Sequence, residues 1–439
     1  MASIKEREVF KMGKITFNTR IIGKSGNLLM LSNDFKASLD GFYEKAFVIE
    51  ADTGMHLTDY HSVDFLLRTE EELEWEPMDE FYDNVYPDRV NRNYSRDGLI
   101  GFAVGDALGV PVEFLNKEDV RKINVQDMMG NDTNINFGSR WSDTIPAGAW
   151  SDDTSMTYAT MDSIVRNKGL NYDDIMESYL NWWEKGEYTS LDIPFGLGGT
   201  VADALGRFKR GMPAVESGGK GIRDNGNGAL MRIFPISLYC IEKDLSEEET
   251  VKVISDSSAL THGHDISKMS CFIYTEFLKG LIETKNPKLA FSRIQDIDYY
   301  SYFSKEALEA HKKLLGRKFA SLPDEDINGS GYVVDTLECA IYSIMNTENY
   351  EDAVKMAINT GYDTDTIGGI TGSLAGVLYG EENIPERWKN NLKKKDELDL
   401  IAIKYNFLMN SYKSDIIQEM LSRQEEEVSN PDKNNNKNF

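Results

Sequence analysis

From about residue 95 onward, the chain consists of long segments in which apolar residues recur at helical spacing. Examples are "SMTYATMDSIVRN", "YDDIMESYLNWWEK" and "SKMSCFIYTEFLKGLIE". Apolar side chains that recur every three or four residues form one face of a helix, and that face has to be buried. Gly-rich loops such as "PFGLGGT" lie between these segments and are more numerous than simple helix connections require. The pattern predicts a mainly α-helical domain whose loops do more than connect helices.

The first part of the chain has a different pattern. Between about residues 14 and 80, short β-prone runs such as "KITFNTRII" and "KAFVIEA" are separated by Gly, Ser and Asn turns. We therefore expect a small, acidic, strand-containing domain, α/β or β, over residues 1–95. The helical domain is expected over residues 96–420, followed by a polar, disordered tail over residues 421–439. A chain of 439 residues is long enough for this division.

The charge balance narrows the classes of partner. The chain has 73 acidic and 48 basic residues, a formal net charge of -25. This balance argues against a nucleic-acid-binding surface, which needs clustered Lys and Arg, and is compatible with divalent cations or a basic protein partner. No apolar run approaches the roughly 18 residues of a membrane-spanning helix, and the charged N-terminus does not resemble a signal peptide. The three widely spaced cysteines are typical of reduced core residues. We expect a cytoplasmic protein.

One carboxylate stands in an unusual place. In "GFAVGDALGVPVEFL", the apolar helix should end near Gly109 and Pro111. Glu113 follows that break, between the apolar residues Val112 and Phe114. A carboxylate is costly to bury there unless a cation or a hydrogen-bond donor meets it.

Two further segments place acids and hydroxyls at helix starts. The first is "WSDDTSMT" and the second is "GYDTDTIGG". Taken alone, each has a simpler interpretation as a helix cap with acids in its first turn. Together with Glu113 they supply five carboxylates and several hydroxyls with no Cys or His nearby, a ligand set suited to Mg²⁺, Mn²⁺ or Ca²⁺. Two cations would relieve the repulsion among the carboxylates and could activate a water between them.

Two other segments carry weaker signals. "DNGNGALMR" places a Gly/Asn loop ahead of a helix, where bare backbone N–H groups can bind a phosphate, although such a loop is more often a simple turn. "SALTHGHDISKM" places His262 and His264 in one turn, and a ligand contact and a cap or surface loop are equally consistent with this pattern.

Five motifs in one order resemble a known family. "GFAVGDALGVPVEF", "WSDDTSMT", "GNGALMR", "LTH" and "GYDTDTIGGITGSLAG" follow one another over roughly residues 96 to 380. In order and content they resemble the ADP-ribosylglycohydrolase family, which includes the dinitrogenase reductase-activating glycohydrolase. The resemblance implies an all-helical domain with a binuclear centre of two Mg²⁺ or Mn²⁺ ions. It also implies that the chain cleaves ADP-ribose from a modified group, so that an ADP-ribosylated protein is its substrate.

The resemblance also implies roles for individual residues. Glu113, Asp152 and Asp365 are the expected catalytic residues. The expected metal ligands are Ser151, Asp152, Asp153, Asp363, Asp365 and Thr366. The expected substrate-binding residues are Asn227, Gly228 and Ala229 at a phosphate, His262 at the ribose, and Gly198 and Gly199.

Two positions depart from the family pattern. Ser151 stands where threonine is usual, and either hydroxyl can coordinate a metal. Gly196, in "DIPFGLGG", stands where arginine-directed members often have an acid, and Asp192 lies four residues earlier.

Three functions follow as alternatives. The first is metal-dependent removal of ADP-ribose from a modified protein, with arginine as the favoured linkage. The second is an immunity protein that neutralises an ADP-ribosyltransferase toxin by direct binding through residues 1–95, with or without hydrolysis; the simpler interpretation of those residues is a packing extension. The third, a catalytically dead scaffold, is disfavoured because nearly all the acidic ligands are present.

Overall fold

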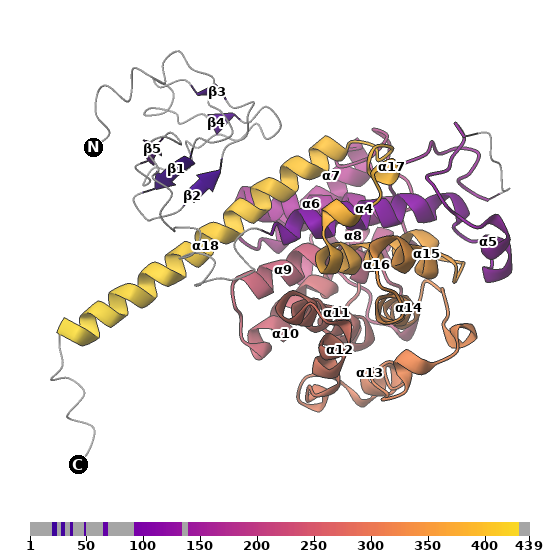
Figure 1. The fold of residues 1–439 in the computed structure, drawn as a ribbon. Coiled ribbons are helices and arrows are strands. Elements are labelled where there is room, and N and C mark those ends of the chain that lie inside the picture. Colours follow the sequence, from indigo (N-terminus) through magenta and orange to yellow (C-terminus); the bar gives the residue numbers. More distant parts are fainter. Residues whose placement is uncertain are drawn as a thin grey trace. The chain divides into compact units, whose positions relative to one another are not determined.

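The structure is a computed structural model, and it describes residues 92–133 and 139–429, with side chains up to residue 412 (Figure 1). Before residue 92 it describes only the backbone of short strands. The predicted domain over residues 1–95 therefore falls almost wholly outside the described residues, and so do residues 430–439 of the predicted tail.

The short strands pair in two antiparallel groups. Strands β1 (Arg20–Gly23), β2 (Leu28–Met30) and β5 (Phe65–Arg68) form a sheet in the order β2-β1-β5. Strands β3 (Lys36–Ala37) and β4 (Val48–Ile49) pair with each other.

From residue 92 on, the described regular structure is helical, which confirms the predicted mainly α-helical domain (Figure 1). Residues 94–406 form one compact unit, and residues 1–93 and 407–439 form a second. The helices are α4 (Tyr94–Gly109), α5 (Lys117–Ile123), α6 (Asp152–Asn167), α7 (Tyr172–Lys185), α8 (Gly199–Lys209), α9 (Phe234–Glu242), α10 (Glu247–Ala259), α11 (Asp265–Thr284), α12 (Pro287–Gln295), α13 (Lys305–Ala310), α14 (Val333–Met345), α15 (Tyr350–Ile358), α16 (Thr364–Tyr379), α17 (Glu386–Lys389) and α18 (Lys395–Ser429). Short 3-10 turns, among them η2 (Val110–Val112) and η5 (Leu230–Arg232), lie between them.

Helices α4 and α16 form the closest pair in the unit. Each carries three glycines spaced four residues apart, so the glycines of each helix lie on one face. They are Gly101, Gly105 and Gly109 on α4, and Gly368, Gly372 and Gly376 on α16. A methyl group added at Gly105 would overlap the carbonyl oxygen of Gly368, and one added at Gly372 would overlap that of Gly101. The two backbones are therefore in direct contact.

This contact fixes where the two acidic helix ends meet. The N-terminal half of α4 faces the C-terminal half of α16, while Gly109 at the end of α4 faces Thr364 at the start of α16. The hydroxyl of Thr364 donates to the Gly109 carbonyl oxygen at 2.8 Å. The antiparallel pair thus brings Glu113, just past α4 and η2, to the beginning of α16.

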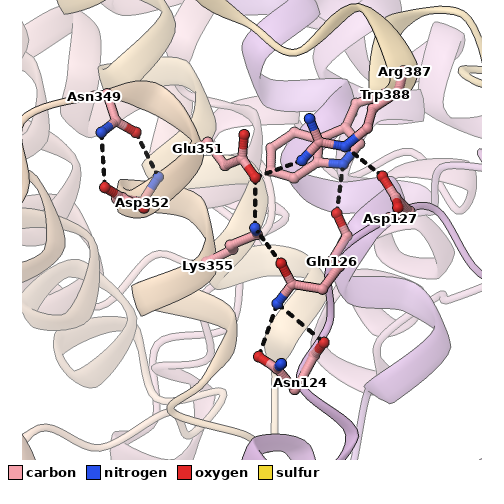
Figure 2. A network of polar contacts seen from close by, with 9 residues as sticks. All are labelled: Asn124, Gln126, Asp127, Asn349, Glu351, Asp352, Lys355, Arg387 and Trp388. Carbon is pink, nitrogen blue, oxygen red and sulfur yellow. Dashed lines mark hydrogen bonds and ion pairs between the residues drawn. The ribbon is translucent and has the colours of Figure 1, made fainter.

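A polar network fastens the segment after α5 to two distant helices (Figure 2). The indole N–H of the buried Trp388 donates to the Gln126 carbonyl oxygen at 3.0 Å. Lys355 on α15 donates to the Gln126 side chain at 2.7 Å, and Arg387 on α17 is ion-paired with Asp127 and Glu351 at 2.5 Å each. The Trp388 ring also lies below the guanidinium of Arg387, 5.1 Å from its centroid. These contacts anchor one end of the loop that leads from α5 to α6.

Among the described residues, no single helix is long and apolar enough to cross a membrane. The segments Tyr94–Val112 and Lys117–Ile123 meet that criterion only together, and they are bent by 104° at their junction.

Candidate active site

Three carboxylates from the ends of α4 and α16 lie together. Glu113 follows η2, Asp363 is the residue before α16, and Asp365 lies in its first turn. One oxygen atom from each lies within 4.8 Å of the other two. Glu113 and Asp365 are buried. The structure therefore brings together two of the three acidic segments that the sequence predicted to share a site.

The third segment, at the start of α6, reaches the same place. Helix α6 packs against both α4 and α16. Burial raises the pKa of Asp153 at the start of α6, and the charge of Asp363 adds to this effect together with those of Asp152 and Asp106. Ser151 is the N-cap of α6, since its hydroxyl oxygen accepts from the Asp153 amide at 3.2 Å. The capping interpretation is therefore confirmed for Ser151, and its role as a metal ligand stays a prediction.

Asp106, which our sequence analysis did not identify, holds the start of α6 in position. Its buried carboxylate accepts from the amide of Ser151 at 3.0 and 3.1 Å, from the amide of Thr154 at 3.1 Å and from the Thr154 hydroxyl at 2.6 Å. A lone acid inside the apolar run "GFAVGDALG" was the available signal, because such a residue has to find donors when it is buried.

Burial and mutual repulsion disfavour negative charge at this cluster. Burial, followed by the charge of Asp106, raises the pKa of Asp152 to about 8. Burial raises the pKa of Asp153 and of Asp365 well above its ordinary value, with neighbouring carboxylates adding to the effect. Burial, followed by the charge of Asp363, raises the pKa of Glu113 to about 8.

The residues present fit a divalent cation. Oδ2 of Asp153 is buried and has no hydrogen-bond partner among the described residues, so one ligand atom is free. Carboxylate and hydroxyl oxygens are the ligands that Mg²⁺, Mn²⁺ and Ca²⁺ prefer, and a cation would offset the repulsion that raises these pKa values.

Glu113 accepts a hydrogen bond from another side chain of this protein. The indole N–H of Trp141 donates to Oε2 of Glu113. The Trp141 ring packs against Phe195, with the centroids 5.3 Å apart, and against a buried cluster that includes Val110 and Ile145. Trp141 was also not identified from the sequence, where only the need for a donor or cation near Glu113 could be stated.

The Gly/Asn loop reaches the same cluster. The side-chain amide of Asn227 donates to Oδ2 of Asp363 at 2.5 Å and to the Thr336 hydroxyl at 2.9 Å. The predicted helix does not follow this loop directly, because η5 intervenes and α9 begins only at Phe234. Phosphate binding by the backbone at Asn227, Gly228 and Ala229 stays a prediction.

His262 lies beside this loop. Nδ1 of His262 is 2.9 Å from the Thr261 hydroxyl, and the ring is so close to Gly228 that a Cβ there would lie 2.8 Å from its Cε1 atom. Burial, assisted by the positive charge of Arg232, lowers the His262 pKa to about 3, so the imidazole is neutral at physiological pH. By contrast, His264 caps α11 by accepting from the Ile266 amide at 3.2 Å, so the capping interpretation is confirmed for this histidine.

Gly198 and Gly199 begin helix α8. Gly198 is its N-cap, without a side-chain capping bond, and no atom lies within 4 Å of a Cβ added at either glycine. This helix start is open, and Val201 in its first turn lies beside Gly228.

Gly196 lies directly against the carboxylate of Asp152. Its φ is +93°, and a Cβ at this position would overlap Oδ1 of Asp152. An acidic side chain at position 196 would adopt a strained backbone conformation and would have to displace the Asp152 carboxylate. The carboxylate of Asp192 is exposed and forms an ion pair with Lys394 at 2.6 Å.

Comparisons with known proteins agree with this geometry. The sequence model of the ADP-ribosylglycohydrolase family matches residues 88–415. The chain is 30% identical over 327 residues to ADP-ribosylarginine hydrolase Tri1 of Serratia proteamaculans, covering 72% of this chain and 80% of that protein. It is 26% identical over 305 residues to ADP-ribosyl-[dinitrogen reductase] glycohydrolase of Rhodospirillum rubrum, covering 69% and 91%. A solved structure described as an ADP-ribosylglycohydrolase-related protein complex matches with a TM-score of 0.58 and 25% identity, over 72% of this chain and 98% of that one. The chain therefore belongs to the ADP-ribosylglycohydrolase family of hydrolases.

Proposed function

We propose that this protein removes ADP-ribose from modified arginine side chains of a protein, using a centre of two Mg²⁺ ions. The meeting of three acidic segments around Glu113, Asp363 and Asp153 is the observation that carries the proposal. The arginine linkage is supported by similarity to the Serratia relative, which is named an ADP-ribosylarginine hydrolase.

The expected ligands of the centre are Ser151, Asp152, Asp153, Asp363, Asp365 and Thr366. Bound cations would supply positive charge that orients the ribose hydroxyls and lowers the pKa of a water molecule. Asp106 and Asn227 would act behind these ligands, since Asp106 holds the start of α6 and Asn227 holds the Asp363 carboxylate. Such outer contacts fix the direction in which a ligand presents its oxygen.

Glu113 is the candidate for proton transfer. As the bond to the anomeric carbon breaks through an oxocarbenium-like state, the leaving guanidine needs a proton and the attacking water has to lose one. Glu113 is suited to this exchange because its pKa is raised to about 8, close to the working range, and because Trp141 holds one of its oxygens. His262, neutral and buried, would contact the ribose as a hydrogen-bonding group.

The test is Glu113→Gln. This variant should retain Mg²⁺ binding, measured by calorimetry, and lose release of ADP-ribose by about 10²–10⁴-fold. Undiminished release would remove Glu113 from the mechanism.

Two expectations stay predictions. Neutralisation of an ADP-ribosyltransferase toxin through residues 1–95 depends on a segment that lies outside the described residues. A cytoplasmic location depends on sequence alone.

A further inference from the structure

Two exposed aromatic residues flank the carboxylate cluster in an unusual backbone conformation. Phe114 directly follows Glu113, has φ of 68° and is 54% exposed. Tyr362 directly precedes Asp363, has φ of 65° and is 51% exposed. Positive φ is rare for bulky residues, and it persists where the surroundings enforce it, most often at functional sites.

The backbone itself enforces this arrangement. The amide of Phe114 donates to the Tyr362 carbonyl oxygen at 2.6 Å, and the amide of Tyr362 donates to the Leu115 carbonyl oxygen at 2.6 Å. The reciprocal pair ties the residue after Glu113 to the residue before Asp363. The Phe114 ring is thereby held at the solvent edge of the cluster.

A guanidinium group already lies on this ring. The Cζ atom of Arg140 is 5.8 Å from the centroid of the Phe114 ring and 4.4 Å from that of the Trp141 ring. Within the part of the chain that the structure describes, Arg140 forms no ion pair and is exposed, while its charge acts on Glu113 nearby. Two aromatic faces therefore hold this cation, beside the carboxylate that Trp141 contacts.

We propose that the faces of Phe114 and Trp141 form an aromatic slot for the guanidinium of the ADP-ribosylated arginine, and that Arg140 occupies this slot until substrate displaces it. The proposal rests on the proposed function. This slot would supply a contact for the guanidinium even though position 196 is a glycine and offers no acid. Recognition through π-faces needs no acid, and it favours a planar guanidinium over an uncharged acceptor such as a serine ester or ether.

The first experiment compares two substrates, one linked to ADP-ribose through arginine and one through serine. Phe114→Leu keeps an apolar side chain but removes the ring, and should raise KM for the arginine-linked substrate about tenfold with little change for the serine-linked one. Phe114→Tyr keeps the aromatic face and should behave as wild type. Trp183→Leu, at an exposed aromatic residue of α7, is the matched control. An equal rise in KM for both substrates would show that the ring contacts ADP-ribose and would overturn the slot.

Arg140→Ala tests whether the Arg140 side chain competes with substrate for the aromatic slot. Its removal should lower KM for the arginine-linked substrate, because the competing guanidinium is gone. A higher KM would make Arg140 part of the substrate contact and would contradict its assignment.

Binding separates this inference from the proposed function. In the Glu113→Gln background, calorimetry with ADP-ribosylarginine and with free ADP-ribose should show that Phe114→Leu weakens only the former. If the wild type does not hydrolyse the arginine linkage, the proposed function fails. If Phe114→Leu leaves ADP-ribosylarginine binding unchanged, the slot fails whatever the turnover.

Discussion

The glycine contact between α4 and α16 predicts a large effect from the smallest possible substitution. Gly105→Ala adds one methyl group, and that group would overlap the Gly368 carbonyl oxygen and lie 3.1 Å from the Gly369 nitrogen. Overpacking a core costs about 1–3 kcal/mol, and we expect the upper value because the opposing atoms belong to backbone. The better helix propensity of alanine offsets about 1 kcal/mol, which leaves about 2 kcal/mol of destabilisation.

The matched control is Gly206→Ala in α8. There the nearest atom to a Cβ is Nη1 of Arg210, 3.3 Å away at the end of a flexible side chain. Only the propensity gain remains, so this variant should be more stable than wild type by up to about 1 kcal/mol.

The assay is thermal unfolding followed by circular dichroism. For the unit of residues 94–406, whose unfolding entropy is about 0.66 kcal/mol/K, about 2 kcal/mol corresponds to a fall in Tm of roughly 3 °C for Gly105→Ala, and Tm should rise by up to roughly 1.5 °C for Gly206→Ala. Since the same contact places Glu113 beside Asp363, Gly105→Ala should also weaken Mg²⁺ binding at temperatures where it stays folded. Equal Tm changes in the two variants would refute the view that direct backbone contact joins these helices.

Three further predictions concern single side chains. Asp106→Asn offers fewer acceptor lone pairs to the four hydrogen bonds at the start of α6. The Mg²⁺ affinity measured by calorimetry should therefore fall about 10–100-fold, while the helical circular dichroism stays unchanged. An unaltered affinity would show that Asp106 does not position the ligands. Trp141→Phe removes the donor to Glu113 but keeps a ring, so kcat should fall about 10–100-fold with KM nearly constant, and a change confined to KM would contradict a positioning role. Burial lowers the pKa of His311 to about 4, whereas in the unfolded chain it protonates near 6.5, so its contribution makes the folded state less stable as pH falls from 6.5 to 4. His311→Gln lacks this effect, and its loss of unfolding free energy between pH 7 and pH 5 should be smaller than that of wild type by about 2 kcal/mol; identical pH profiles in denaturant titrations would refute the assignment.

Local sequence patterns predicted the parts of this structure that local chemistry determines. The apolar spacing that predicted helices after residue 95 is a property of each segment, and the structure confirms it. Capping also follows from neighbouring residues, as at Ser151 and His264. The convergence of Glu113 with Asp363 was predicted from the shared oxygen chemistry of their segments and from motifs whose order resembles a family.

The remaining features depend on contacts between distant segments. Asp106 and Thr154 are 48 residues apart, and Trp141 and Glu113 are 28 residues apart. The sequence around Asp106 does not specify Thr154 as its partner, and the sequence around Trp141 does not specify Glu113. The glycines of α4 and α16 were visible as small residues, but their contact depends on how two helices pack. The η5 turn before α9 was missed because "GALMRIFPISLY" has the apolar character of a continuous helix.

The central claim is that the carboxylates at the ends of α4 and α16 and at the start of α6 hold a metal that hydrolysis requires. The measurement that tests it most directly is release of free ADP-ribose from an arginine-ADP-ribosylated protein, with and without Mg²⁺, for wild type and an Asp363→Ala/Asp365→Ala double variant. We predict release by the wild type that depends on Mg²⁺ and is abolished in the double variant. Release that persists in the double variant, or that is unaffected when the metal is chelated, would contradict the claim.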